Sequence, residues 1–151
     1  MSKLPRIVAI FSIAAGALMI VVGITAYFLV QQELSEENIT VSDDADRFAG
    51  EPVEGPLTAY SEAMVIKKHA LEIGGGLTYA ELPQDDPNRA AVQDASFLRA
   101  SLFTSVVAFG VAVLVAGLGL MFILVGLALL GILRRLPDVV VGEPVAQPAV
   151  A

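Results

Sequence analysis

The chain has 151 residues, of which 56% are apolar, and it contains no cysteine and a single histidine. The apolar share is above the roughly 45–50% of soluble domains, and the lack of cysteine excludes disulfides, thiolate catalysis and cysteine metal sites. Fourteen of the sixteen acids lie between Glu33 and Asp94 beside only four bases, so this acidic segment is not expected to bind nucleic acid or anionic lipid.

The first apolar run follows a short start, residues 1–6, that carries Lys3 and Arg6. Residues 7–30 contain no charge, and at about 1.5 Å per residue they would make roughly 36 Å of helix, enough to cross a hydrocarbon core of about 30 Å. A cleaved signal peptide is the alternative, but its apolar region would have about 7–15 residues and end at small residues. This run ends in aromatic residues such as Tyr27, which suit a membrane interface. The sequence therefore predicts a first transmembrane helix over residues 7–30.

The segment 31–99 holds too many charges to enter lipid, and we expect it to form a small, mostly helical extracytoplasmic domain. Ser42, followed by acids and by Gly50, predicts a brief helix over residues 42–50. Apolar residues at spacings of three and four predict an amphipathic helix over residues 57–73. Its expected inner face comprises Ala59, Ala63, Ile66, Ala70 and Ile73, widened by Tyr60, Met64 and Leu71, and its polar face comprises Ser61, Glu62, Lys68, His69 and Glu72.

Two helix starts follow three consecutive glycines that end the amphipathic helix. Thr78 and Glu81 have the spacing of a capping box and predict a short helical turn. Asp86 and Pro87 then have the pattern of a cap and a first helical position. Because nothing after Pro87 breaks a helix, the sequence predicts a stalk helix that continues into the second apolar run, residues 100–133.

This second run has thirty-four residues without a charge, about 51 Å of helix and more than one hydrocarbon core. In one interpretation, a single span of about twenty-three residues follows an apolar stalk that packs on the external domain. In the other, the chain forms a hairpin that turns at residues 117–119. The hairpin would have short arms and would carry Arg134 and Arg135 to the outside, against the positive-inside rule. The single span is therefore favoured.

The basic residues indicate the orientation of the chain. Lys3 and Arg6 precede the first span, and Arg134 and Arg135 follow the second, so both termini are expected in the cytoplasm and the acidic loop outside. The tail, residues 134–151, has no helical period and is predicted to be disordered. The expected fold class is an all-α plasma-membrane protein with two transmembrane helices, the second continuous with an external stalk.

Small residues recur in both spans at spacings that let helix backbones approach closely in lipid. They could serve packing of the two spans within one chain, which we favour, or self-association and docking to a larger membrane complex. Neither span contains an ionisable residue, which counts against an ion pathway or a proton relay. The candidate packing residues are Ser12, Gly16, Ala108, Ala112, Ala116 and Gly119.

Candidates for metal chemistry are few. His69 and Glu72 lie three residues apart on one helix and could touch the same metal, but two ligands do not complete a site, and Lys67 and Lys68 would repel a cation. A surface histidine beside a Lys68–Glu72 ion pair is favoured. The acids of residues 43–46 fit a helix start better than a calcium loop. No cofactor and no catalytic set is therefore expected.

Several strings in the chain are distinctive, namely ENITVSDDADRFAG, GPLTAY, KKHALE, TYAEL and ASFLRASLFTSVVAFGVAVLVAGLGL. Over roughly residues 7–130 they resemble a family of small actinobacterial membrane proteins with two spans and an acidic external loop. Members often carry the automatic label "aromatic ring-opening dioxygenase". Such enzymes hold iron with two histidines and a carboxylate, or with two histidines and two tyrosines, and one histidine cannot supply either set.

We therefore expect a non-enzymatic accessory or structural component of the actinobacterial cell envelope. Its expected partners are the lipid bilayer and, through self-association or a larger complex, other membrane proteins. Two alternatives remain open. One is a metal-dependent enzyme of the ring-opening dioxygenase type, with iron bound by His69 and nearby acids. The other is an oligomeric pore or transporter subunit, in which Ser101, Thr104 and Ser105 would be the polar residues near the second span.

Overall fold

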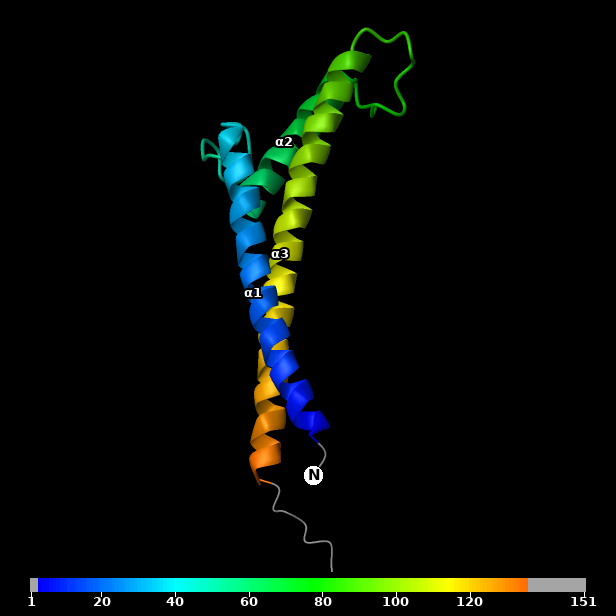
Figure 1. Ribbon diagram of the computed structural model, residues 1–151. Coiled ribbons are helices and arrows are strands. Elements are labelled where there is room, and N and C mark those ends of the chain that lie inside the picture. Colours follow the sequence, from blue (N-terminus) through cyan, green and yellow to red (C-terminus); the bar gives the residue numbers. More distant parts are fainter. Residues whose placement is uncertain (1–2, 136–151) are drawn as a thin grey trace, which may run out of the picture.

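The computed structural model describes residues 3–135 of the chain. In that range the chain forms three helices and no strand: α1, Leu4–Glu36; α2, Pro56–Ile73; and α3, Arg89–Arg135. Figure 1 shows α1 and α3 as a long antiparallel pair, with α2 lying against the N-terminal half of α3. The prediction of an all-helical fold with two long apolar helices is confirmed.

α1 and α3 are both long and apolar enough to cross a membrane. α1 has 33 residues, about 50 Å, because its polar end remains helical, where the Gln32 amide donates a hydrogen bond to Glu36 at 2.9 Å. α3 has 47 residues, about 70 Å. The most apolar 18-residue window is only 22% buried in α1 and 11% buried in α3, so most apolar side chains of both helices face outward.

α3 is one uninterrupted helix through residues 117–119, where the hairpin alternative would require a turn. It begins at Arg89, two residues after the predicted start, and the Asp86 carboxylate accepts a hydrogen bond from the backbone N–H of Asn88 at 2.8 Å. Its last residue is Arg135, so the predicted disordered tail starts two residues too early. The remainder of that tail lies outside the described residues.

The helix predicted over residues 42–50 is wrong, because this segment forms turns and bends. Phe48 and Gly50 have positive φ angles of 61° and 76°, which a right-handed helix does not accept. Thr40 instead forms an isolated antiparallel bridge with Pro52. The segment 37–55 therefore folds back on itself as a compact loop beside α2.

The helical turn predicted to start at Thr78 forms as one isolated turn, in which the backbone N–H groups of Glu81 and Leu82 donate to the Thr78 carbonyl at 3.0 and 3.1 Å. The backbone N–H and the hydroxyl of Thr78 donate to the Glu81 carboxylate at 2.9 and 2.7 Å, and this lowers the pKa of Glu81. The carbonyls of Tyr79 and Leu82 accept hydrogen bonds from the Arg89 guanidinium. These bonds tie the segment to the start of α3 as a set of turns.

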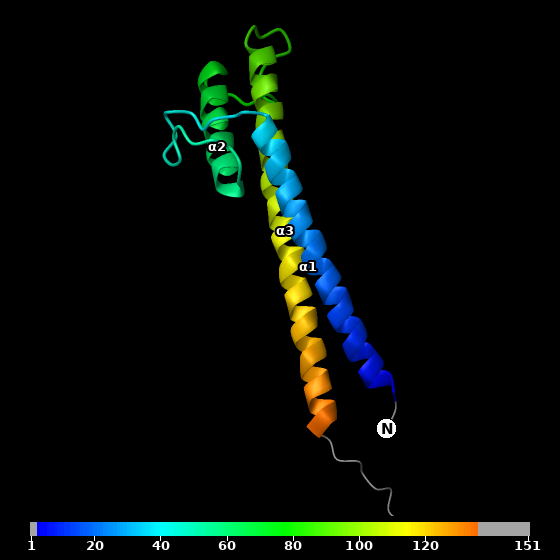
Figure 2. The same ribbon diagram turned by 60° about the vertical axis from the view of Figure 1, so that its left-hand side comes forward.

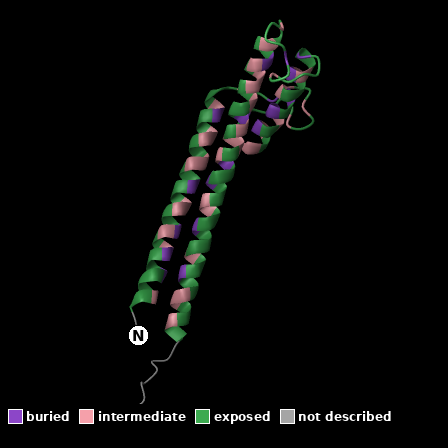
Figure 3. Cartoon of the chain, turned by 90° about the vertical axis from the view of Figure 1, so that its right-hand side faces the viewer, coloured by how far each residue is buried: buried purple, intermediate pink, exposed green. Residues whose placement is uncertain are grey.

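The main apolar core lies where the end of α1, the start of α2 and the middle of α3 meet. Figure 3 shows buried residues gathered there and along the facing sides of α1 and α3. Figure 2 shows from another side how α2 and its loop lie beside the upper part of the helix pair. The buried members of this core are Leu34, Val41, Val53, Ala59, Ala63, Leu102 and Phe109.

α2 differs from its predicted faces at four positions, since Tyr60, Met64 and Ile73 of the expected inner face are exposed and Glu62 of the expected polar face is buried. Ala59 and Ala63 are buried as expected, but Ile73 is 44% exposed because it lies at the end of the helix, beyond the core. Glu62, predicted on the polar face, is only 7% exposed. The reason is that the loop 37–55 covers that side of α2 and supplies hydrogen-bond donors to the carboxylate.

Candidate functional site

α1 and α3 pack through small residues that recur every seven positions. A period of seven keeps one face of each helix toward its partner in a shallow left-handed crossing, and small side chains let the backbones approach closely. We call these six buried residues the small-residue seam: Ala9, Gly16 and Gly23 of α1, and Ala112, Gly119 and Gly126 of α3.

At the centre of the seam, Gly16 lies directly against Gly119. A Cβ atom added to Gly119 would lie 2.6 Å from the carbonyl oxygen of Gly16 and 2.9 Å from the backbone nitrogen of Ile20. A Cβ atom on Gly16 would in turn meet the carbonyl oxygen of Gly119 and lie 2.9 Å from the backbone nitrogen of Ile123. Because these neighbours are backbone atoms, they cannot rotate away.

The two ends of the seam are equally close. A Cβ atom on Gly23 would lie 2.7 Å from the carbonyl oxygen of Ala112 and 2.8 Å from the backbone nitrogen of Ala116. A Cβ atom on Gly126 would lie 2.7 Å from the carbonyl oxygen of Ala9. The helices therefore touch backbone to backbone over three contacts, which together define one antiparallel register.

One polar bond crosses the seam. The Ser12 hydroxyl donates to the backbone carbonyl of Phe122 on α3 at 2.8 Å. Ser12 is buried between the helices, where an unpaired hydroxyl would be costly. The bond therefore satisfies Ser12 and adds a directional contact to packing that is otherwise apolar.

The predicted packing residues divide into three groups. Ser12, Gly16, Ala112 and Gly119 lie between the helices, Ala116 borders Gly23 at one edge, and Ala108 is half-buried. Ala9, Gly23 and Gly126 are not among the predicted packing residues, because that prediction relies on a spacing of four, which relates Ala108, Ala112 and Ala116 within one helix. The signal that finds them is the shared spacing of seven in both spans.

Three other glycines of α3 face away from the seam. A Cβ atom added to Gly110, Gly117 or Gly131 would have no heavy atom within 4 Å. These positions are separated by seven and fourteen residues, so they lie on one outward side of the helix. They are not needed for the contact between α1 and α3.

A polar cluster joins the loop 37–55 to α2. The carboxylate of buried Glu62 accepts hydrogen bonds from the backbone N–H of Ser42 at 2.8 Å and from its hydroxyl at 3.1 Å. The Ser61 hydroxyl donates to the backbone carbonyl of Arg47 at 2.7 Å. Ser42, predicted as a helix cap, therefore serves as the donor pair that accommodates a buried carboxylate.

Exposed charged side chains also connect the loop 37–55 to α2. Asp44 Oδ2 lies 2.8 Å from Lys68 Nζ and 2.9 Å from His69 Nε2. These hydrogen bonds, that of Lys68 first and that of His69 second, lower the pKa of Asp44 to about 2, and the bond to Asp44 raises the pKa of Lys68. The predicted Lys68–Glu72 ion pair is replaced by this contact, because the folded loop brings Asp44 closer.

His69 and Glu72 are the two metal candidates of the sequence. The His69 ring bonds to Asp44. Among residues 3–135, no group of three or more histidine, aspartate or glutamate side chains is arranged to hold a metal. Two of the three polar residues named for a pore are bonded within their own helix, since the hydroxyls of Thr104 and Ser105 donate to carbonyls one turn earlier in α3.

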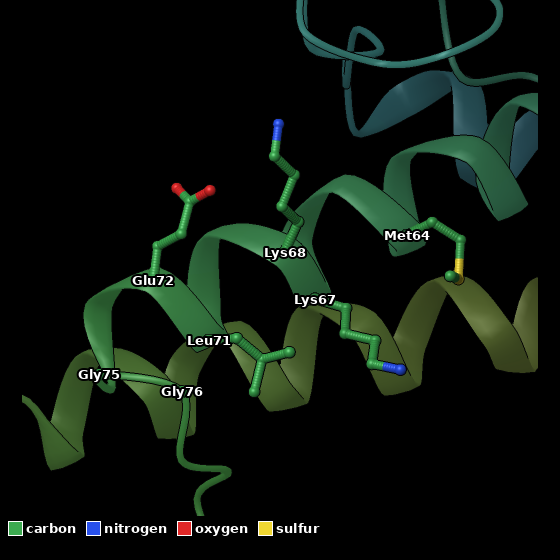
Figure 4. Close-up of a pocket in the computed structure, with 7 residues that line it drawn as sticks. All are labelled: Met64, Lys67, Lys68, Leu71, Glu72, Gly75 and Gly76. Atoms are coloured by element: carbon green, nitrogen blue, oxygen red, sulfur yellow. The ribbon is translucent and has the colours of Figure 1, made fainter.

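Two hollows lie beside the C-terminal half of α2. Figure 4 shows the larger, an open groove of about 600 Å³ in which Lys68 and Glu72 extend on one side of α2 and Lys67 on the other. The smaller, about 80 Å³, lies between α2 and α3 and is lined in part by Lys67 and Arg99. The Arg99 guanidinium lies over the ring of Phe103, 5.2 Å from its centroid.

The four topology residues lie at the same end of the helix pair. Lys3 and Arg6 are at the start of α1, and Arg134 and Arg135 form the last turn of α3. Figure 1 shows both of these ends together, opposite the end that carries α2. The long axis of the molecule is therefore basic at one end and acidic at the other.

Comparison of the chain with known protein families, with curated proteins and with solved structures finds no match.

Proposed function

We propose that the chain is an integral protein of the plasma membrane in which α1 and α3 each cross the bilayer once. The observation that carries this proposal is the outward apolar surface of both helices, of which the most apolar windows are only 22% and 11% buried. The core helix of a soluble protein would bury most of that surface, because exposing it to water costs about 25 cal/mol per Å². A hydrocarbon environment removes this cost.

In this proposal the basic end lies in the cytoplasm, and α2 with its flanking segments lies outside. The support is the charge asymmetry between Lys3, Arg6, Arg134 and Arg135 at one end and the acidic segment at the other. α3 extends beyond the bilayer and carries α2 on its surface, so its first turns serve as a stalk.

We further infer a non-enzymatic accessory role in a larger membrane assembly of the cell envelope. Three features support it: the external part is organised by buried polar contacts, its α2 groove is open, and the outward glycine positions of α3 are clear of neighbours. The groove and the glycine face offer two surfaces for other proteins, one outside and one in the bilayer.

Orientation is tested with single-cysteine variants, because the chain has no cysteine of its own. Exposed Glu54 lies in the loop and exposed Leu4 at the basic end. In intact cells a membrane-impermeant maleimide should label Glu54→Cys and should label Leu4→Cys only after lysis. Labelling of both in intact cells, or of neither until lysis, would contradict the proposed topology.

The accessory role is tested by purification in mild detergent from cells that make the protein at native levels. We expect a stable complex or self-oligomer, and we expect Gly117→Leu to weaken any association made in the bilayer while leaving the α1–α3 pair intact. A strictly monomeric protein without partners would contradict this role. Stoichiometric iron in the purified protein would replace it with the enzymatic alternative.

A further inference from the structure

The register of the helices fixes the level at which α1 leaves the bilayer. Gly16 opposes Gly119, and Tyr27 packs on Phe109 with ring centroids 4.8 Å apart. In an antiparallel pair, each step forward along α1 is matched by one step back along α3, and the residue numbers of these two pairs accordingly add up to 135 and 136. Extending this register places Val30, the last residue of the apolar run, beside the region of Ser105 in α3. Beyond Val30, α1 becomes polar and acidic, so the hydrocarbon core must end near this level.

α2 starts at the same level rather than above it. Tyr60 packs edge-on against Phe103, with ring centroids 5.8 Å apart. α2 and α3 are antiparallel, so Leu57, almost one turn before Tyr60, lies nearer still to the middle of the spans. Figures 1 and 2 agree that the N-terminal end of α2 lies below the C-terminal end of α1.

The side chains at this end of α2 are apolar and turned outward. Leu57 is 66% exposed, Tyr60 is 48% exposed, and Met64, one turn further on, is 38% exposed. The opposite face of the same turns is fully used, since Ala59 and Ala63 are buried in the main core. Leu57 and Tyr60 therefore lie on a side of α2 that does not contribute to the core, and they form a second, exposed apolar face.

The neighbours of this face have the character of a membrane interface. Tyr27 and Phe28 of α1 lie at the level of Phe109, and Tyr60 packs on Phe103, six residues or roughly 9 Å nearer the start of α3. These rings form a band of aromatic side chains around the end of the apolar run. The Arg99 guanidinium lies over the ring of Phe103, one helical turn later in α3. The charge is therefore closer to the proposed bilayer than the backbone of Arg99 is. The Nε atom of Arg99 is buried and has no hydrogen-bond partner among the described residues. Aromatic rings with a cation just beyond them are typical of the headgroup region.

We propose that the first two turns of α2 are inserted into the adjacent leaflet, where Leu57 and Tyr60 contact phospholipid acyl chains and Arg99 lies at headgroup level. The proposal rests on the proposed membrane insertion of α1 and α3. It makes α2 a third membrane-contacting element that sets how deeply the external part is seated. We assign lipid, rather than a protein, to this face because it lies at the level where the apolar run of α1 ends and because its neighbours are aromatic and basic residues typical of the headgroup region.

The experiment uses tryptophan as a depth probe, since the chain contains none. Four variants of the full chain are reconstituted in phosphatidylcholine vesicles: Leu57→Trp, Tyr60→Trp, Leu118→Trp in the middle of α3, and Leu77→Trp beyond the far end of α2. All four positions are exposed in the folded chain, so the fold should tolerate the larger ring. Emission is measured with lipids brominated at shallow or at deep acyl positions.

We expect Leu57→Trp and Tyr60→Trp to lose most intensity with shallow bromines, Leu118→Trp with deep bromines, and Leu77→Trp with neither. Unquenched Leu57→Trp and Tyr60→Trp beside quenched Leu118→Trp would overturn the proposed insertion of α2 while leaving the membrane spans in place. Blue-shifted but unquenched emission at position 57 would assign the face to a second copy of the chain instead, since the vesicles contain no other protein. Unquenched Leu118→Trp would contradict the proposed spans themselves.

Discussion

Substituting alanine for two glycines of α3 that are only two residues apart tests whether the small-residue seam holds the helices together. Gly119 lies in the seam, and Gly117 faces outward with no heavy atom within 4 Å of an added Cβ. Both substitutions make the same change in helix propensity, about 1 kcal/mol in favour of alanine in water. The difference between the two variants therefore isolates the steric effect of a methyl group in the seam.

The geometry gives the size of that effect. In Gly119→Ala the new methyl group would lie 2.6 Å from the carbonyl oxygen of Gly16, whereas ordinary van der Waals contact begins near 3.4 Å. The helices must separate by nearly 1 Å at this point, and gaps of that size forfeit about a quarter to a half of each affected dispersion contact. Overpacking of this kind costs about 1–3 kcal/mol. We expect the free energy of separating α1 from α3 to be lower in Gly119→Ala than in Gly117→Ala by that amount.

The free energy of separating α1 from α3 can be measured by resonance energy transfer. Cysteines replacing Leu4 and Ile132 are exposed, at the same end of the helix pair, and can carry donor and acceptor dyes. Mixtures of a mild detergent and dodecyl sulfate shift the equilibrium toward separated helices. Equal midpoints for Gly119→Ala and Gly117→Ala, or a lower midpoint for Gly117→Ala, would refute the seam as the stabilising contact.

Three further variants test individual contacts. Ser12→Ala removes the hydrogen bond across the seam and should cost about 0.6–1.7 kcal/mol in the same transfer assay. Glu62→Ala leaves two partly buried donors of Ser42 without their partner and should cost about 1–3 kcal/mol. The loss should appear as faster amide hydrogen exchange in the loop, whereas Glu72→Ala, at an exposed position, should not change that exchange. The pKa of Asp44 is lowered from 3.8 to about 2, mainly by its hydrogen bond to Lys68 and next by that to His69. The stability that the Asp44 carboxylate contributes to the folded loop is therefore present above about pH 4 and is lost as pH falls through 2. Asp44→Asn should abolish this acid step in loop exchange.

The helices of the spans could be read from the sequence because their signal is local. Two charge-free runs, residues 7–30 and 100–133, predict apolar helices regardless of what they contact, because neither run contains proline and a helix satisfies every backbone polar group in lipid even where glycine is present. α2 also followed from periodicity alone, within one residue at its start. The structure extends α1 to Glu36, a stretch for which hydropathy gives no signal because its residues are polar but favour helix.

The loop could not be predicted, because its conformation depends on contacts with α2. Ser42 followed by acids has the composition of a helix start, yet its N–H and hydroxyl bond to Glu62, twenty residues later. Asp44 likewise bonds to Lys68 rather than serving a helix dipole. A pattern of capping residues reports which side chains can accept or donate locally, and a buried carboxylate offered by a neighbouring helix competes successfully for the same donors.

The seam shows the same limit for helix packing. A spacing of four, as in Ala108, Ala112 and Ala116, marks one face of a single helix, but two helices that run together for a long distance touch every seven residues. Which small residues meet is then decided by the register between helices, a tertiary property. That register also determines the level of α2 relative to α1, since α2 is positioned on α3 and α3 on α1. The proposed depth of Leu57 in the leaflet would thus depend on a register set by glycine contacts as distant as that of Gly126, roughly 30 Å along α3 at about 1.5 Å per residue.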